Sequence, residues 1–414
     1  MVSYKYLYNI LPQLLFSILL FSVIILIFIT KPWGDEIAFH YPNAKYFSLE
    51  RIIMEDSQYS SAYTPLPYLF SKIILQVHDS ILSLRIFNFI IFIILCLFIY
   101  LISKKISNSP FLLTLIIISN PYLLRSAYAY YMFNYGLTFS IIGIYLYFFS
   151  TLRYRYFFSH IFLGLAVLSQ QWMLIIIVSI FIFELFIENN YGVPLIRFIK
   201  LFVVKLIILL PSIYLFILWG GLTHPNFHFH KLYPTFEHLN AVLANWGYLT
   251  FFIVLFYFRD YLYKKYLIPL VFVFPILFFS IPSHSSDQGV HQITGLVSQL
   301  SSTLSKIISI PYQFIFFIFV MFGLGFLVIS IIKEKREFET FIFYVLVLLL
   351  IVFTASIRLG ASHILLSAPF IFLLFNKEIF KYRYLKYLIL FQLYFTSIFY
   401  IYYYALFVVK GRSF

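Results

Sequence analysis

The chain has 414 residues, of which 63% are hydrophobic and only 11% are charged, and its mean hydropathy is +0.95. A water-soluble protein of this length could not bury so much apolar surface, so the composition excludes a soluble globular fold and indicates an integral membrane protein. The net charge of +14 lies in short basic clusters between apolar runs, as topology signals do, and no nucleic-acid-binding module is recognisable. Nucleic acid is therefore not an expected partner.

Apolar runs follow one another along the whole chain, and most are close to the roughly 20 residues that a membrane-spanning helix needs. They predict an all-α polytopic membrane protein with about thirteen transmembrane helices. The first run is longer than the apolar core of a signal peptide and lacks a small-residue cleavage pattern, so we expect a retained first helix. The runs are 11–31, 85–103, 110–126, 131–151, 157–170, 172–188, 198–219, 240–258, 266–282, 311–333, 339–356, 361–375 and 386–409.

The basic residues predict which connections face the cytoplasm. With the N-terminus inside, the even-numbered connections become cytoplasmic, and each of them carries a basic cluster, as the positive-inside rule expects. These clusters are Lys104 with Lys105; Arg153 with Arg155; Arg197, Lys200 and Lys205; Arg259, Lys264 and Lys265; Lys333, Lys335 and Arg336; and Lys377, Lys381, Arg383 and Lys386. The short 157–170 run is the weakest point, because every later loop changes sides if it does not span.

This topology gathers the polar chemistry on the non-cytoplasmic side. The external segments are 32–84, 220–239, 283–310 and the short connection 358–363, and they hold all ten histidines except His160. The first of them opens with two adjacent acids, Asp35 and Glu36. These acids either end the first helix in solvent or face a water-filled cavity, where partial desolvation would raise their pKa values.

Five segments in the first 175 residues carry a resemblance to a known family, and they occur in the family's order. The most specific is the acidic segment, with Asp35-Glu36-Ile37, Phe39-His40, Pro42, Ala44 and Tyr46. The others are Tyr63-Thr64-Pro65-Leu66-Pro67, Leu84-Arg85-Ile86-Phe87-Asn88, Tyr130-Tyr131 and Gln170-Gln171. Together they resemble the dolichyl-phosphate-glucose α-1,2-glucosyltransferases, a branch of the glycosyltransferase C superfamily. The chain departs from the family pattern at Met132-Phe133, where the family has Thr-Asp, and at Gln170, where it has Arg.

The resemblance implies a glycosyltransferase C-like bundle whose external loops form the active site. It implies transfer of a hexose, as glucose is in the family, from a polyprenyl-phosphate sugar to a glycan or lipid-linked oligosaccharide, by direct displacement with inversion. Asp35 is then the candidate catalytic base, with Glu36 as a second acid or a positioning partner. The donor is already activated on its lipid, so no nucleotide-binding motif is required and no cofactor is expected. The catalytic module is expected at 1–220, followed by variable helices and loops at 221–414.

Departure of a phosphate requires cationic groups nearby, and several external residues are candidates. Arg85 begins an outward-facing helix end, and Arg358 and His363 flank the last external connection; arginine suits bidentate phosphate contact, although interfacial anchoring explains such residues equally well. His40 either binds the phosphate, orients the acid or is an ordinary loop histidine. Tyr63 is a further candidate substrate contact.

The loop 220–239 contains His224, His228, His230 and His238. His228 and His230 could meet a metal with His224, but no cysteine or second ligand pair supports zinc, and we expect no metal. We favour a sugar-binding surface, with His228 and His230 as substrate contacts and with Phe227, Phe229, Tyr233 and Trp246 stacking on sugar rings.

The expected location is the endoplasmic reticulum or a prokaryotic plasma membrane, with the site on the luminal or external face and membrane lipid around the helices. A transporter or flippase of lipid-linked sugars is the alternative. It is disfavoured because charges within the apolar runs are scarce, Glu184 lying near a cytoplasmic end, and because the two halves show no repeat.

Overall fold

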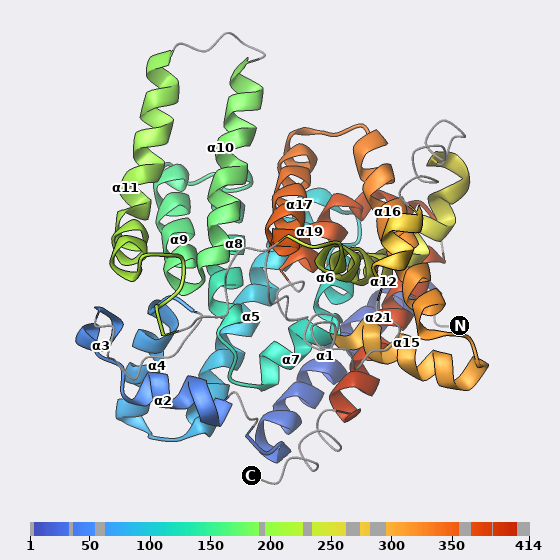
Figure 1. The fold of residues 1–414 in the computed structure, drawn as a ribbon, viewed down its shortest axis with the longest axis horizontal. Helices are drawn as coiled ribbons and strands as arrows, with labels where there is room; N and C mark the ends of the chain where they lie inside the picture. Colours follow the sequence, from blue (N-terminus) through green and yellow to red (C-terminus); the bar gives the residue numbers. More distant parts are fainter. Residues whose placement is uncertain are drawn as a thin grey trace. The chain divides into compact units, whose positions relative to one another are not determined.

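The computed structural model describes residues 4–32, 36–53, 63–189, 195–226, 234–261, 274–281, 295–355, 366–382 and 384–403 (Figure 1). Helices make up most of these residues and no strand occurs among them, which confirms the all-α prediction. The chain divides into two compact units, one of residues 1–228 with 396–414 and one of residues 229–395. The sequence analysis predicted a boundary between two modules at residue 220, with all of 221–414 in the second module.

Six helices in the described part of the chain are long and apolar enough to cross a membrane, or seven if one bent pair is a single span. They are Ile10–Ile29, Ile81–Ile106, Phe198–Trp219, Phe236–Tyr257, Tyr312–Ile332 and Glu337–Ala355. The expected count of about thirteen is not confirmed. Several predicted runs form helices of only 10–17 residues, among them Phe133–Phe148 and Arg155–Ser169, and others fall partly outside the described residues.

The first unit contains the helices up to residue 219 and the end of α21. Its long helices are α1 (Tyr4–Ile29), α5 (Ile81–Ile106) and α11 (Leu195–Trp219). Shorter ones lie between them, namely α6 (Pro110–Ile118), α7 (Pro121–Tyr128), α8 (Phe133–Phe148), α9 (Arg155–Ser169), η2 (Gln171–Met173) and α10 (Leu174–Asn189). Helix α8 packs on both α5 and α9, and α1 packs on α5, α6 and α7.

Proline and asparagine explain why this part of the chain breaks into short helices. Helices α6 and α7 are bent by 76° at a short break, and each has proline in its first turn. The first helix ends at Ile118, and Asn120 caps the second, since its side-chain oxygen accepts the N–H of Tyr122 at 2.9 Å. A residue before proline avoids the helical conformation, so the Asn120-Pro121 pair turns the chain there.

Four short elements precede α5. They are the π-helical turn η1 (Glu36–His40), α2 (Tyr41–Lys45), α3 (Leu49–Ile53) and the amphipathic α4 (Leu66–Val77). Helix α4 turns Tyr68, Ser71 and Leu75 inward, at the three- and four-residue spacing of one helix face. Ser80 then caps α5 by accepting the N–H of Ser83 at 3.1 Å, which sets the starting point of the helix that carries Arg85.

The second unit consists of α12 (Phe236–Tyr261), α15 (Gly295–Ile308), α16 (Tyr312–Ile332), α17 (Glu337–Ala355), α19 (Ser367–Leu374), α20 (Asn376–Lys381) and most of α21 (Leu385–Tyr403). Helices α12 and α16 touch through glycine. A Cβ on Gly247 would lie 1.8 Å from the carbonyl oxygen of Phe319, and one on Gly323 would lie 2.0 Å from that of Leu243. Only glycine permits so close an approach of the two backbones.

Candidate functional site

The C-terminal end of α1 is bound by a single arginine. Helix ends leave carbonyl groups without intrahelical partners, and a cation there also favours the helix dipole. The Nη1 of Arg85 donates to the carbonyl oxygens of Ile27 at 3.3 Å and Thr30 at 2.8 Å and to the Thr30 hydroxyl at 3.1 Å, while its Nη2 donates to the carbonyl oxygen of Lys31 at 3.1 Å. Arg85 therefore joins the start of α5 to the end of the first helix.

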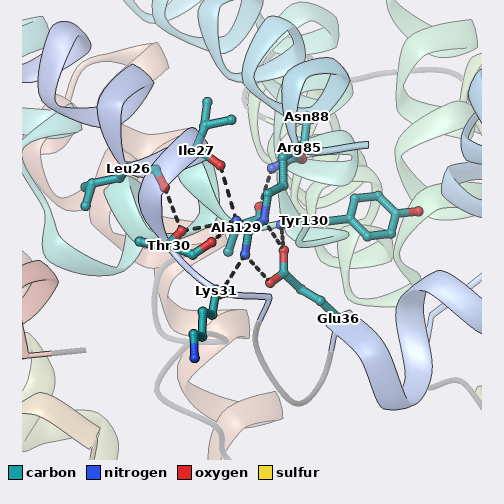
Figure 2. Close-up of polar contacts among 9 residues, drawn as sticks. All are labelled: Leu26, Ile27, Thr30, Lys31, Glu36, Arg85, Asn88, Ala129 and Tyr130. Atoms are coloured by element: carbon teal, nitrogen blue, oxygen red, sulfur yellow. Dashed lines mark hydrogen bonds and ion pairs between the residues drawn. The ribbon is translucent and has the colours of Figure 1, made fainter. Parts of the chain in front are cut away.

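The same guanidinium holds Glu36 in a bidentate ion pair, which Figure 2 shows. The Arg85 Nε donates to Oε1 of Glu36 at 2.8 Å and Nη2 donates to Oε2 at 2.6 Å. Both side chains are buried, with exposed fractions of 4% for Arg85 and 0% for Glu36. A buried charge is tolerated only when it is paired and hydrogen-bonded, and this parallel arrangement is the strongest form of such a pair.

A third element reaches Glu36 from the junction of α7 and α8. The backbone N–H of Tyr130 donates to Oε1 of Glu36 at 2.7 Å. That junction is held by Asn88, one turn after Arg85 in α5, whose Nδ2 donates to the carbonyl oxygens of Ser126 at 2.6 Å and Ala129 at 2.8 Å. Arg85 and Asn88 thus place α1, the acidic segment and the Tyr130 backbone around one carboxylate.

Tyrosine rings surround His40 next to this ion pair. Its Nδ1 lies 3.1 Å from the Tyr68 hydroxyl, and its ring centroid lies 5.6, 6.1 and 5.7 Å from those of Tyr63, Tyr130 and Tyr131. Burial of His40 lowers its pKa to about 4, so the imidazole is neutral at pH 7. The neighbouring Tyr130 hydroxyl donates to Ser71 of α4, and burial raises the pKa of Tyr130 well above its ordinary value.

Two further hydrogen bonds tie the preceding segments to the helices behind them. The Thr64 hydroxyl donates to the carbonyl oxygen of Val167 in α9 at 2.9 Å, and the Trp219 indole N–H at the end of α11 donates to the carbonyl oxygen of Ile52 at 2.8 Å. Ala44, Ile52, Tyr68 and Trp219 belong to one buried hydrophobic cluster. The segments that precede α5 are therefore held against α9 and α11 by hydrogen bonds and by apolar packing.

A second ion pair in the same region is exposed. Lys45 of α2 and Asp79, before α5, are 2.6 Å apart with exposed side-chain fractions of 37% and 47%, and the Tyr41 hydroxyl donates to Asp79 at 2.6 Å. The hydrogen bond from Lys45, followed by that from Tyr41, holds the pKa of Asp79 below its usual range. The pair joins α2 to the start of α5 at the surface.

The structure brings together the predicted site residues Glu36, His40, Tyr63 and Arg85. Asp35, His228, His230, Arg358 and His363 lie outside the described residues, as do the other loop aromatics, Phe227, Phe229 and Tyr233. Arg85 uses all five of its N–H groups on Glu36 and the end of α1, so the structure gives it a positioning role instead of the predicted phosphate contact. His40, being neutral and buried, likewise fits a positioning role better than phosphate binding.

The predicted sugar-stacking role does not fit Trp246. Its side chain is fully buried in α12 and its indole N–H donates to the Ser367 hydroxyl at 3.0 Å, because the position lies within an apolar helix rather than in the loop. His224 is buried as well and packs at the edge of the Trp219 ring. In the part of the chain that the structure describes, no three histidine, cysteine or acidic residues lie close enough together to hold a metal.

Sequence reasoning did not assign roles to Asn88, Ser71 and Tyr68. Asn88 follows Arg85 by three residues, so helical spacing places both on one face of α5 and could have marked it as a partner. Ser71 and Tyr68 share the inward face of α4 in the same way. The pairing of Glu36 with Arg85 across 49 positions carries no such local signal.

No family model matches this chain, and no match is found among curated proteins. The chemistry of the region must therefore be argued from its own geometry. That geometry fixes an acidic segment at the end of the first membrane helix, neutralises one of its two acids in an ion pair, and surrounds the segment with tyrosines.

Proposed function

We propose that the chain is a membrane glycosyltransferase that moves a hexose from a polyprenyl-phosphate sugar to a glycan or lipid-linked acceptor by inverting displacement. Asp35 is the base, and the resemblance to the dolichyl-phosphate-glucose glucosyltransferases is consistent with this reaction. The observation that carries the proposal is the buried Glu36–Arg85 pair, which fixes the acidic segment against the end of α1.

The ion pair separates the roles of the two acids. Glu36 accepts hydrogen bonds from two N–H groups of Arg85 and from the N–H of Tyr130, so it orients the segment. Asp35, the preceding residue, then takes the acceptor hydroxyl proton as that oxygen attacks the anomeric carbon. The bond from the anomeric carbon to the phosphate oxygen breaks, and the electron pair leaves with the polyprenyl phosphate.

The developing phosphate charge needs a cation that is not already engaged. Arg85 is fully used, and His40 is neutral at pH 7. Arg358 and His363, in a short Gly-containing connection outside the described residues, therefore stay the candidates that the sequence offers for the phosphate contact. Replacing Arg358 by Ala should weaken use of the donor and leave the acceptor KM unchanged.

The decisive test is Asp35→Asn in the full-length protein, assayed with radiolabelled polyprenyl-phosphate hexoses. Transfer should fall by roughly 10²- to 10⁴-fold, the usual contribution of a general base, while expression and membrane insertion stay normal. Asp79→Asn is the matched control, because Asp79 is an exposed acid of the same region. Wild-type transfer by Asp35→Asn would remove Asp35 as the base.

A transporter of lipid-linked sugars is the second candidate, and one observation favours it. Glu184 of α10 and Lys205 of α11 form a buried ion pair between two apolar helices, and the Tyr147 hydroxyl of α8 donates to Glu184 at 2.7 Å. Intramembrane charges often line transport pathways. If Lys205→Met stops the flipping of a fluorescent polyprenyl-phosphate hexose in proteoliposomes, and Asp35→Asn does not, the transporter reading replaces the enzyme.

A further inference from the structure

The side-chain amide of Gln170 is fully buried, yet neither end of it is hydrogen-bonded. Among the described residues, neither its Nε2 nor its Oε1 has a partner. Its backbone is satisfied, because the N–H donates to the carbonyl oxygen of Ala166 at 2.8 Å and the carbonyl accepts the N–H of Met173 at 3.0 Å. A buried amide without partners destabilises the folded protein, so such a group calls for an explanation.

Two other buried amides of the same unit are hydrogen-bonded. Asn88 donates to two carbonyl oxygens, and Asn134 donates to the carbonyl oxygen of Ser126 at 2.7 Å. The unit therefore contains backbone acceptors that satisfy amides, and Gln170 is held away from them. Its position, rather than a general lack of partners, leaves its two polar ends available.

The packing around Gln170 fixes where the amide lies. A Cβ on Gly136 would come within 2.9 Å of the Gln170 Cβ and 3.2 Å of its Oε1, so glycine at 136 makes room for this side chain at the start of α8. Tyr135, the residue before it, belongs to the same buried cluster as Tyr68 and Tyr130. Val167, three residues before Gln170, accepts the hydrogen bond from Thr64, next to Tyr63. The amide thus lies at the end of α8 and α9 that adjoins the candidate site.

Two serine hydroxyls near the amide are buried and unpartnered as well. Ser169 precedes Gln170 in the chain, and Ser140 follows Gly136 by four residues, so it shares the face of α8 that receives the glutamine. Four polar atoms on the facing parts of α8 and α9 therefore lack hydrogen bonds in the described structure. Each serine hydroxyl, like the amide, can both donate and accept.

We propose that Gln170 recognises a pair of neighbouring hydroxyl groups on a hexose, with its Oε1 accepting from one and its Nε2 donating to the other. This inference rests on the proposed glycosyl transfer, and it names a specificity residue for it. An ionised phosphodiester has only acceptors and would satisfy Nε2 alone, whereas a cation would satisfy Oε1 alone. Adjacent sugar hydroxyls offer both, and the hexose belongs either to the lipid-linked donor or to the acceptor.

The test uses Gln170→Met in the purified full-length protein, because methionine keeps the volume and removes both polar ends. The first probe is the ten-carbon isoprenyl phosphate of glucose, mannose or galactose, whichever the wild type binds best, with its 2-, 3-, 4- and 6-deoxy analogues. The second probe set is the methyl glycosides of the same sugars, which represent the acceptor. Calorimetry gives the Kd values, and thermal unfolding gives Tm.

The wild type should bind one of the deoxy analogues about 10- to 100-fold more weakly than the parent sugar, since one or two hydrogen bonds are lost. Gln170→Met should bind the parent as weakly and no longer distinguish the two, with Tm unchanged or raised. Gln170→Asn, which keeps the amide but shortens its reach, should also lose affinity. The probe set in which this occurs, lipid-linked or methyl glycoside, identifies the source of the hydroxyls.

Asn245→Leu is the matched control, because Asn245 of α12 is a buried amide whose Oδ1 is likewise unpartnered; it should leave every hexose Kd unchanged. Equal hexose binding by the wild type and Gln170→Met, or a Tm loss in that variant without a change in deoxy-sugar discrimination, would overturn the role of Gln170. Discrimination without sugar transfer by the wild type would instead reject the proposed reaction and keep the hydroxyl site. Sugar transfer by the wild type, together with unaltered deoxy-sugar discrimination in Gln170→Met, would reject the role of Gln170 and keep the proposed reaction.

Discussion

The two units of the chain stabilise apolar helices in different ways. In the first, the buried side chains of Arg85 and Asn88 bond to backbone carbonyls at the ends of α1 and α7. In the second, the long helices α12 and α16 approach through Gly247 and Gly323 until their backbones touch. Glycine contacts bring helices together without polar groups, whereas helix breaks expose backbone groups that must be satisfied. In the first unit, the helix ends and breaks supply both the polar groups of the candidate site and the positions that hold them.

The largest expected effect tests the glycine side of this comparison. Gly323→Ala should destabilise the protein by roughly 5 kcal/mol or more, or prevent folding, because the added methyl group meets a backbone carbonyl that cannot move aside. Thermal unfolding in detergent measures the effect. Gly221→Ala is the control, since no atom lies within 4 Å of the added Cβ there. Similar Tm values for both variants would mean that the α12–α16 contact is not so close.

The next prediction concerns the polar side. Arg85→Met should cost about 3–5 kcal/mol, because it leaves the buried Glu36 carboxylate and the carbonyls at the end of α1 without their cation. The double variant Glu36→Leu with Arg85→Met should recover part of that loss, as it removes the unpaired charge. Lys45→Met, at the exposed pair, should stay close to the wild type. Equal losses for Arg85→Met and Lys45→Met would show that burial does not distinguish the two pairs.

The third prediction uses pH to probe His40 and the tyrosine rings around it. His40 has a folded pKa of about 4 against 6.5 in the unfolded chain, so the unfolded state binds more protons between those values. The contribution of His40 to stability is complete above pH 6.5, falls as the pH drops below it, and levels off below about pH 4 after a loss on the order of 3 kcal/mol. His40→Gln should flatten this part of the pH–stability curve. An identical curve for variant and wild type would contradict the buried, neutral state of His40.

The smallest effect is expected at the exposed ion pair. Asp79→Asn should change Tm by less than about 2 °C, because solvent screens the interaction with Lys45. Added salt should remove the remaining difference from the wild type. A larger change in Tm that salt does not reduce would show that the Lys45–Asp79 pair behaves like the buried Glu36–Arg85 pair and not like a surface pair.

Composition and the lengths of the apolar runs were enough to predict the class of protein and most of its helices. Apolar runs of sufficient length leave a helix in lipid as the only way to satisfy the backbone, so the all-α membrane fold followed from composition and run length. The adjacent acids Asp35 and Glu36 stand out against an apolar background, and the family resemblance singled out Arg85 and the Tyr130-Tyr131 pair. The number of spans was not found, since the 110–126 run bends at Asn120-Pro121 and other runs form helices of only 10–17 residues, which hydropathy does not resolve.

Only the tertiary structure decided how the marked residues pair. Glu36 and Arg85 are 49 positions apart, and nothing local reveals that one guanidinium neutralises the acid and binds the end of α1 at once. Burial gave His40 its neutral state, placed Trp246 inside a helix bundle, and left the Gln170 amide without partners. Pairing, burial and hydrogen-bond satisfaction depend on which segments meet in space, and a linear pattern of residue types does not contain that information.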